Sequence, residues 1–86
     1  MNFIKDHAYY FKWGNNAKYH YINKVKKVDS EHITYYAIHA NDPNKLDNLI
    51  NYPFVDTVDY VLNNCKEIVH LGPADTVKQT HPEYFI

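Results

Sequence analysis

The fold prediction begins with residues 8–38, which read AYYFKWGNNAKYHYINKVKKVDSEHITYYAI. The segments on either side of Gly14-Asn15-Asn16 alternate in polarity and are rich in tyrosine, valine and isoleucine, and the cluster between them is a turn signal. A second turn at residues 29–31 precedes another β-branched and aromatic run. We therefore predict a three-stranded antiparallel meander. Its expected strands cover residues 8–13, 18–28 and 32–38.

The first of two expected helices begins at Asn41-Asp42-Pro43. Asp42 is a favourable N-cap, and proline is well tolerated at the first helical position. The helix should end near Tyr52, because the residue before a proline is pushed out of the α region. The apolar residues that follow the start at helical spacing are Leu46, Leu49 and Ile50.

The second expected helix covers residues 54–66. Asp56 in its first turn and Lys66 in its last turn suit the helix dipole. On such a helix Asp56 and Asp59 should point into solvent, whereas Cys65 should be buried. The apolar positions at helical spacing are Phe54, Val58, Val61, Leu62 and Cys65.

The end of the chain predicts a further strand and a short helical segment. Residues 67–71 form an apolar run that Gly72-Pro73 ends, and residues 74–80 can form one or two helical turns. We therefore predict a single α+β domain over residues 1–86 with the order βββααβ. Its small antiparallel sheet has three strands, or four if residues 67–71 join it, and two helices cover one face.

Length and composition limit the class of protein. The chain has 86 residues, 45% hydrophobic and 22% charged, so it should fold as a globular domain, alone or as a small oligomer such as a homodimer. A membrane-spanning run of about 18 apolar residues and a signal-peptide pattern are both missing from the sequence. The single Cys65 cannot form an internal disulfide. We therefore expect a cytoplasmic protein without a membrane partner, located in the host cytoplasm if the gene is viral.

Motifs for catalysis or cofactor binding are not visible in the sequence. With only two glycines the chain cannot form a dinucleotide or phosphate-binding loop. Cys65 should lie at the C-terminal end of its helix, where the dipole disfavours a thiolate, and Ser30 falls in a turn. We therefore predict a protein that is not an enzyme and has no cofactor. An active site assembled from distant residues is the alternative.

The six histidines raise the question of a metal site. They form no HxxxH pair, and there is no second cysteine for a zinc-finger spacing. No metal site is predicted. A site assembled from distant strands, such as His20 with His39, is the alternative.

The meander is expected to have two unlike sides, because successive residues of a strand point in opposite directions. Tyr9, Phe11 and Trp13 share one side, which should rest on the helices. The other side carries lysines and surplus tyrosines, which supply contact area at protein interfaces. We call it the lysine–tyrosine surface and expect it to bind a partner. Its residues are Tyr10, Lys12, His20, Lys24, Lys26 and Tyr36.

Three functions are compatible with this sequence. The first is a small protein-binding module that occludes a partner's surface. This chain is short, rich in tyrosine and rich in residues that AT-rich codons encode. In these features it resembles the general style of phage-encoded inhibitors of bacterial defence or host proteins, although no family motif is recognised. The second is binding of single-stranded nucleic acid, which the absence of arginine and the net charge of −1 disfavour. The third is sequestration of a small molecule or nucleotide in an aromatic pocket that includes Trp13.

Overall fold

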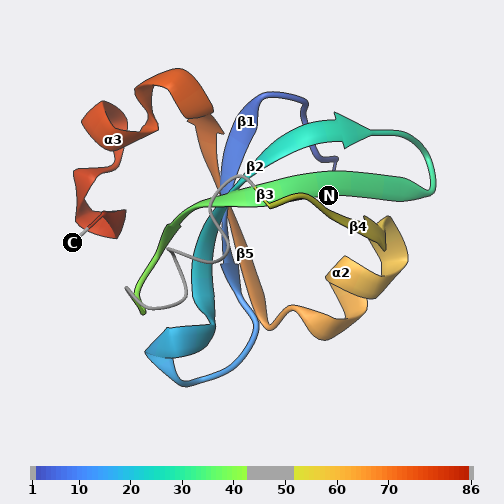
Figure 1. Cartoon of the computed structure of the whole chain (residues 1–86), viewed down its shortest axis with the longest axis horizontal. Coiled ribbons are helices and arrows are strands. Elements are labelled where there is room, and N and C mark those ends of the chain that lie inside the picture. Colours follow the sequence, from blue (N-terminus) through green and yellow to red (C-terminus); the bar gives the residue numbers. More distant parts are fainter. Residues whose placement is uncertain (1, 43–51, 86) are drawn as a thin grey trace.

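The computed structural model describes residues 2–42 and 52–85, and these residues form a five-stranded antiparallel sheet with the order β4-β3-β2-β1-β5 (Figure 1). The α+β class is therefore confirmed. The strands are β1 (His7–Lys12), β2 (His20–Val28), β3 (His32–Ala40), β4 (Phe54–Thr57) and β5 (Glu67–Pro73). The helices are α2 (Val58–Asn64) and α3 (Val77–Thr80), with 3-10 turns η1 (Ala17–Tyr19), η2 (Ala74–Thr76) and η3 (Pro82–Tyr84).

The predicted meander is confirmed, because β1 pairs with β2 and β2 pairs with β3. Side-chain hydrogen bonds fix its turns. The Asn16 side chain accepts from the backbone N–H of Lys18 at 3.1 Å. The Asp29 carboxylate accepts from the backbone N–H groups of Glu31 and His32, each at 2.8 Å, and these bonds lower the pKa of Asp29.

The fourth predicted strand is also confirmed, but a fifth strand was not expected. Residues 67–73 form β5, which pairs with β1 at one edge of the sheet. At the other edge, residues 54–57 form β4 beside β3, although the sequence predicted helix there. The first expected helix, with Leu46, Leu49 and Ile50, lies outside the described residues. The expected element order is therefore corrected to include β4 between β3 and α2.

The prediction of a helix over residues 54–66 was wrong at its start, since α2 begins only at Val58. The Thr57 side chain caps it by accepting from the backbone N–H of Tyr60 at 3.0 Å. The preceding residues instead satisfy their backbone groups along the open edge of β3, where Phe54 lies opposite Tyr35. Hydrogen bonding across the sheet therefore replaces the first turn of the expected helix.

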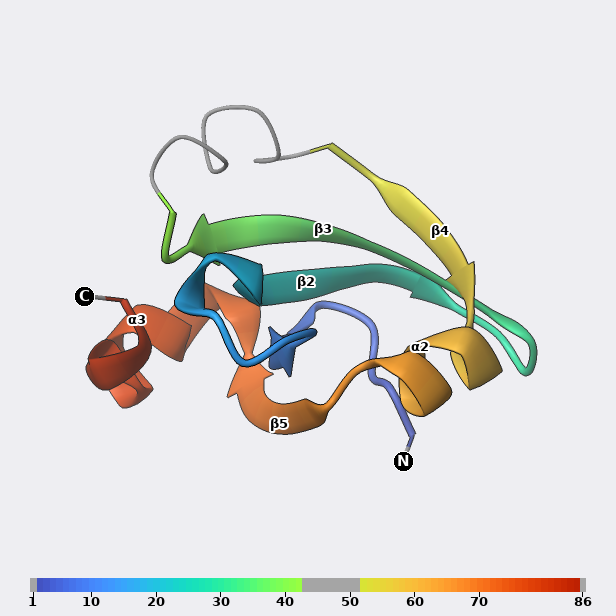
Figure 2. The same ribbon diagram turned by 90° about the horizontal axis from the view of Figure 1, so that it is seen from below.

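The two described helices do not share one face of the sheet, which corrects a second expectation. Val61 of α2 packs with Tyr9 and Phe11, whereas Val77 of α3 packs with Ala8 and Ile22. Neighbours along a strand point to opposite faces, so the helices cover opposite faces. Figures 1 and 2 show α2 and α3 at opposite ends of the molecule. We call these faces the α2 face and the α3 face.

Each face has its own buried core. The α2 face is aromatic, and Cys65 is buried in it as predicted, with burial raising the pKa of its thiol. The α3 face is covered by the C-terminal segment, whose Tyr84 and Phe85 pack against the sheet. The buried residues on the α2 face are Phe3, Tyr9, Phe11, Val25, Ile33, Tyr35, Val61 and Cys65. Across the described ranges, no helix has the length and apolar character needed to cross a membrane.

Candidate ligand-binding site

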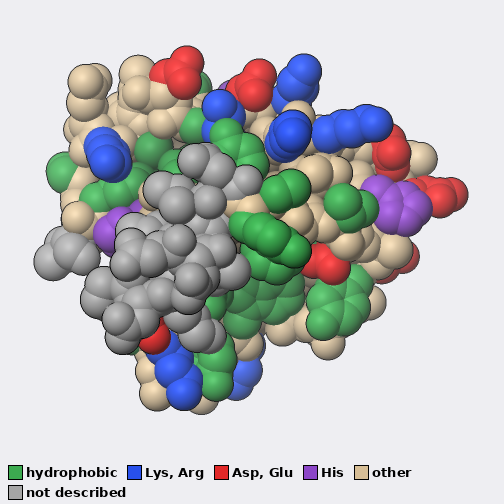
Figure 3. All heavy atoms as spheres, viewed as in Figure 1, with side chains coloured by type: hydrophobic (Ala, Val, Ile, Leu, Met, Phe, Trp, Pro, Cys, Tyr) green, Lys and Arg blue, Asp and Glu red, His purple; other side chains and the backbone are tan. Residues whose placement is uncertain are grey.

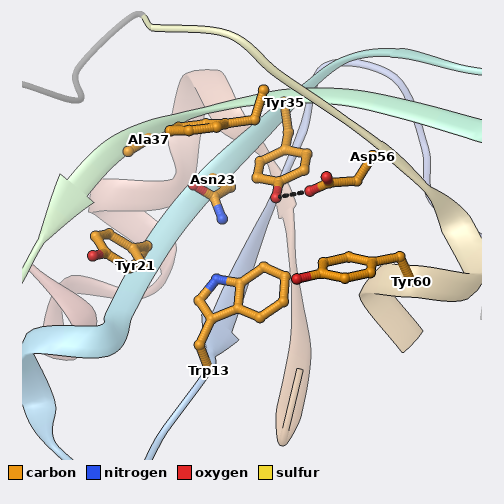
Figure 4. A pocket seen from close by; sticks show the side chains of 8 residues that line it. Trp13, Tyr21, Asn23, Tyr35, Ala37, Asp56 and Tyr60 are labelled. Carbon is orange, nitrogen blue, oxygen red and sulfur yellow. Dashed lines mark hydrogen bonds between the residues drawn. The ribbon is translucent and has the colours of Figure 1, made fainter. Parts of the chain in front are cut away.

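A pocket of about 280 Å³ opens on the α2 face, next to the buried core (Figure 4). Five aromatic rings, one amide, one carboxylate and one methyl group line it. Figure 3 shows hydrophobic side chains gathered between β3 and α2, where the pocket lies. The described residues that line the pocket are Trp13, Tyr21, Asn23, Tyr35, Ala37, Phe54, Asp56 and Tyr60.

The pocket exists because the short helix α2 covers only part of its face. α2 has seven residues, and only Val61 is buried in it. Next to the covered area, cross-strand pairing places Asn23 of β2 beside Ala37 of β3, so a small side chain stands where a larger one would fill the space. The uncovered part of the sheet therefore remains hollow.

The aromatic walls of the pocket are held in place from the core. The ring of Trp13 lies edge-on to Phe11, with centroids 5.8 Å apart, and Phe11 is fully buried. Tyr60 of α2 lies across from Trp13, with centroids 6.4 Å apart. Tyr35 and Phe54, on neighbouring strands, stack at 5.8 Å. These contacts fix ring faces toward the cavity before any ligand is present.

Asp56 brings a negative charge to this aromatic site. The Tyr35 hydroxyl donates to Asp56 Oδ2 at 2.5 Å, a short charge-assisted hydrogen bond (Figure 4). Burial and the nearby carboxylate raise the pKa of Tyr35 far above its usual value, so the phenol remains a donor. The sequence analysis placed Asp56 on a solvated helix face. In the structure it lies on β4, half-buried, because residues 54–57 are extended.

Asn23 supplies an amide at the base of the pocket. Its side chain is 3% exposed, and within residues 2–42 and 52–85 it has no hydrogen-bond partner. Figure 4 shows the amide turned into the pocket on the side of Trp13. The amide is not sealed in the core, because His39 Nε2 alone is a fully buried side-chain atom without a partner in the described residues, so the amide atoms of Asn23 remain accessible from the pocket. The amide group of Asn23 can therefore form hydrogen bonds with a ligand in the pocket.

The predicted lysine–tyrosine surface lies on the α3 face and is divided into two groups. Lys24 and Lys26 line a hollow of about 460 Å³ together with Tyr36, and Lys5 joins them. Asp6 and Pro53 complete the lining. Figure 3 shows lysine side chains gathered over this end of β2. We call this site the lysine hollow.

The second group, Tyr10, Lys12 and His20, lies at the other end of the sheet. Between the groups Ile22 is buried beneath the C-terminal segment with Val77, so the six residues do not form one continuous surface. The Tyr10 ring packs against Tyr84, with centroids 5.1 Å apart. Lys12 lies opposite Glu67 of β5 in the strand register.

His20 has a structural role in this second group. Its Nε2 lies 3.0 Å from the carbonyl oxygen of Gly14, so this nitrogen must carry the proton. Its Nδ1 then accepts from the Tyr10 hydroxyl at 2.9 Å. Both ring nitrogens of His20 are engaged within the protein, which leaves neither for the alternative metal pair with His39. In the described part of the chain, no group of three or more potential metal ligands is found.

A histidine pair that was not expected from the sequence lies at the edge of the sheet. His7 Nδ1 and His70 Nε2 are 2.7 Å apart, and the His70 ring stacks on Tyr9 with centroids 4.6 Å apart. Partial burial, and then the charge of His7, lower the pKa of His70. Residues 67–71 were predicted only as a possible fourth strand, with no partner strand or register, so nothing in the sequence placed His7 and His70 together.

Comparison of the chain with models of protein families, with curated proteins and with solved structures found no match. The geometry of the two sites is therefore the basis for assigning a function.

Proposed function

We propose that this chain is a non-enzymatic binding protein that holds a small ring-bearing molecule in the aromatic pocket. The observation that carries the proposal is the amide of Asn23, a residue that is 3% exposed, which opens without a partner among the described residues into a pocket with aromatic walls. Small-molecule sites in proteins combine such apolar walls with a few convergent polar groups. This is the third of the functions that the sequence left open.

The size and walls of the pocket favour a flat ligand of one or two rings. Its volume of about 280 Å³ is at the lower end of the range for small-molecule sites. Trp13 and Tyr60 approach from one side of the cavity and Tyr35 from another (Figure 4). Ring faces so arranged stack on a planar molecule, and each such contact contributes about 0.5–1.5 kcal/mol beyond the buried area.

The test uses the indole N–H of Trp13, the only tryptophan in the chain, as a reporter. Its single cross-peak in a ¹H–¹⁵N correlation spectrum is followed during titration with benzamide, indole, nucleobases and nucleosides. We expect at least one of these compounds to shift the peak saturably. Asn23→Leu should weaken that binding about tenfold by removing the amide partner.

The matched control is Asn63→Leu, the same substitution at an exposed position of α2. It should leave the titration unchanged. Asn23→Leu should change the free energy of unfolding by no more than about 1 kcal/mol, because the larger leucine side chain can extend into the open pocket. If no ring compound shifts the Trp13 signal saturably, or if Asn23→Leu titrates like the native chain, the proposal is wrong.

A second proposal, binding of a protein partner on the α3 face, is favoured by the lysine hollow. Lys5, Lys24 and Lys26 lie around one depression with Tyr36. Clustered cations around an aromatic ring with a polar tip suit an acidic protein surface. Only half of the predicted lysine–tyrosine surface contributes to this site.

A further inference from the structure

We propose that the aromatic pocket selects a positively charged ring compound, such as an arylamidinium, over neutral and anionic compounds of the same shape. This inference rests on the proposed function and names the chemical class of the ligand. It is carried by the charges that line the pocket.

Asp56 is the only ionic side chain among the eight described lining residues, and neither lysine nor histidine is among them. Three lysines line the separate hollow that contains Tyr36, and Tyr36 points to the opposite face of the sheet from its neighbour Tyr35. A ligand anion in the pocket would therefore meet a carboxylate with no lining cation to offset it. Repulsion of this kind is strong where water is partly excluded.

The Asp56 carboxylate is oriented for a ligand by Tyr35. The Tyr35 hydroxyl donates to Oδ2 and leaves the lone pairs of the other carboxylate oxygen for a further donor. Because the phenol is held far from ionisation, it does not add a second negative charge. A pair of N–H donors on a cation can then bind this carboxylate, which is a stronger interaction than a neutral hydrogen bond.

The rings add a second preference for positive charge. A cation close to the face of tryptophan or tyrosine is attracted by the ring quadrupole, and tryptophan is the best partner. Trp13 and Tyr60 lie 6.4 Å apart between centroids on the side of the pocket that faces Asp56 (Figure 4). Carboxylate and ring faces thus favour the same ligand charge. The Asn23 carbonyl oxygen can accept a further N–H.

The experiment compares three probes of nearly identical shape: benzamidinium, benzamide and benzoate. Each is titrated against the full chain at neutral pH with the Trp13 indole signal as readout. We expect benzamidinium to bind about tenfold more tightly than benzamide, and benzoate to bind most weakly. In Asp56→Asn, which keeps an acceptor for Tyr35, benzamidinium and benzamide should bind within about threefold of each other. The control Glu67→Gln, on β5, should keep the native order.

The outcomes separate this inference from the proposed function. If benzamide binds as well as benzamidinium, the charge selection is wrong and the ring-binding pocket stands. If the preference survives in Asp56→Asn, the assignment of Asp56 is wrong. If none of the three probes shifts the Trp13 signal in the native chain while indole, a nucleobase or a nucleoside does, the charge selection is wrong and the ring-binding pocket stands. Should Asp56→Asn not fold, the order of the three probes on the native chain still decides the question.

Discussion

The two faces of the sheet are built from the same strands and yet present opposite chemistry. On the α2 face, aromatic rings continue from the buried core into an open pocket that contains one carboxylate. On the α3 face, a smaller core lies under the C-terminal segment, and lysines occupy the uncovered end. The two described helices cover each face only in part, because α2 has seven residues and α3 has four. The uncovered parts are where the chain can bind other molecules.

The comparison also indicates which face contributes more to stability. The α2 core contains the large side chains Tyr9, Phe11 and Tyr35, whereas Ala8 and Val77 are typical of the α3 core. Burial of apolar area is the main favourable contribution to folding, and larger side chains bury more of it. We therefore expect the α2 face to hold the fold together, with the α3 face adding to it.

The largest effect should come from Phe11→Ala. Phe11 is fully buried and contacts Phe3, Trp13 and Tyr35, so its loss should lower the free energy of unfolding by about 3–5 kcal/mol. Val77→Ala, at a site that is 1% exposed on the other face, should cost about 2 kcal/mol. Urea unfolding followed by circular dichroism measures both.

A milder substitution at the same position allows the measurement even if Phe11→Ala does not fold. Phe11→Leu keeps most of the volume and should cost about 1.5 kcal/mol or less. If Val77→Ala proves as damaging as Phe11→Ala, the two faces contribute equally and the proposed difference in stability is wrong.

The meander was predictable because its signals are local. Period-two alternation and the Gly14-Asn15-Asn16 cluster specify a hairpin without reference to the rest of the chain. The segment 54–57 was assigned wrongly because Phe54 and Val58 are spaced as in a helix. What decides its structure is the free edge of β3 and the cap at Thr57. The free edge of β3 cannot be read from the segment's own residues, and Thr57 signals a cap only once the helix is known to begin at Val58.

The pocket was harder to predict than the fold. Trp13 was named from the sequence as part of an aromatic pocket, and it lines the pocket on the α2 face. Asn23, by contrast, is an ordinary polar residue of an alternating strand, and Ala37 matters only because it is small. Their pairing follows an irregularity in the β2–β3 register between Ile22 and Asn23. Register shifts of this kind leave no clear mark in a single sequence.

A smaller difference in stability is expected between alanine variants of two tyrosines that the sequence placed on one surface. Tyr10→Ala should lower the free energy of unfolding by about 2 kcal/mol, because it removes the hydrogen bond to His20 and the packing against Tyr84. Tyr36→Ala, in the open lysine hollow, should cost about 0.5 kcal/mol and instead weaken binding of an acidic protein partner. Thermal unfolding of both variants provides the comparison.

Tyr10→Phe is the matched control for this pair. It keeps the ring against Tyr84 and removes only the hydroxyl, so it should cost about 1 kcal/mol. Equal stability losses for Tyr10→Ala and Tyr36→Ala would show that the lysine hollow is part of the structural core and would remove it as a candidate interface.

The smallest effect is the part of the pH dependence that arises from His39 on the α3 face. His39 lies against Phe85, with centroids 5.1 Å apart, and its Nε2 is buried without a hydrogen-bond partner in the described residues. Burial, and then the positive charge of Lys78, lower the pKa of His39. The unfolded chain therefore binds this proton more readily than the folded chain, and stability falls as the pH drops below the usual histidine pKa of about 6.5.

His39→Gln should remove part of this acid sensitivity, whereas His32→Gln, at an exposed position, should not. The measurement is the difference in melting temperature between pH of about 7.5 and about 5.5 for the native chain and both variants. His70 on the α2 face also has a lowered pKa, so some acid sensitivity should persist in His39→Gln. If the loss of stability is the same in all three proteins, protonation of His39 does not act on the C-terminal segment. The acid response would then belong to the α2 face, where His70 stacks on the buried Tyr9.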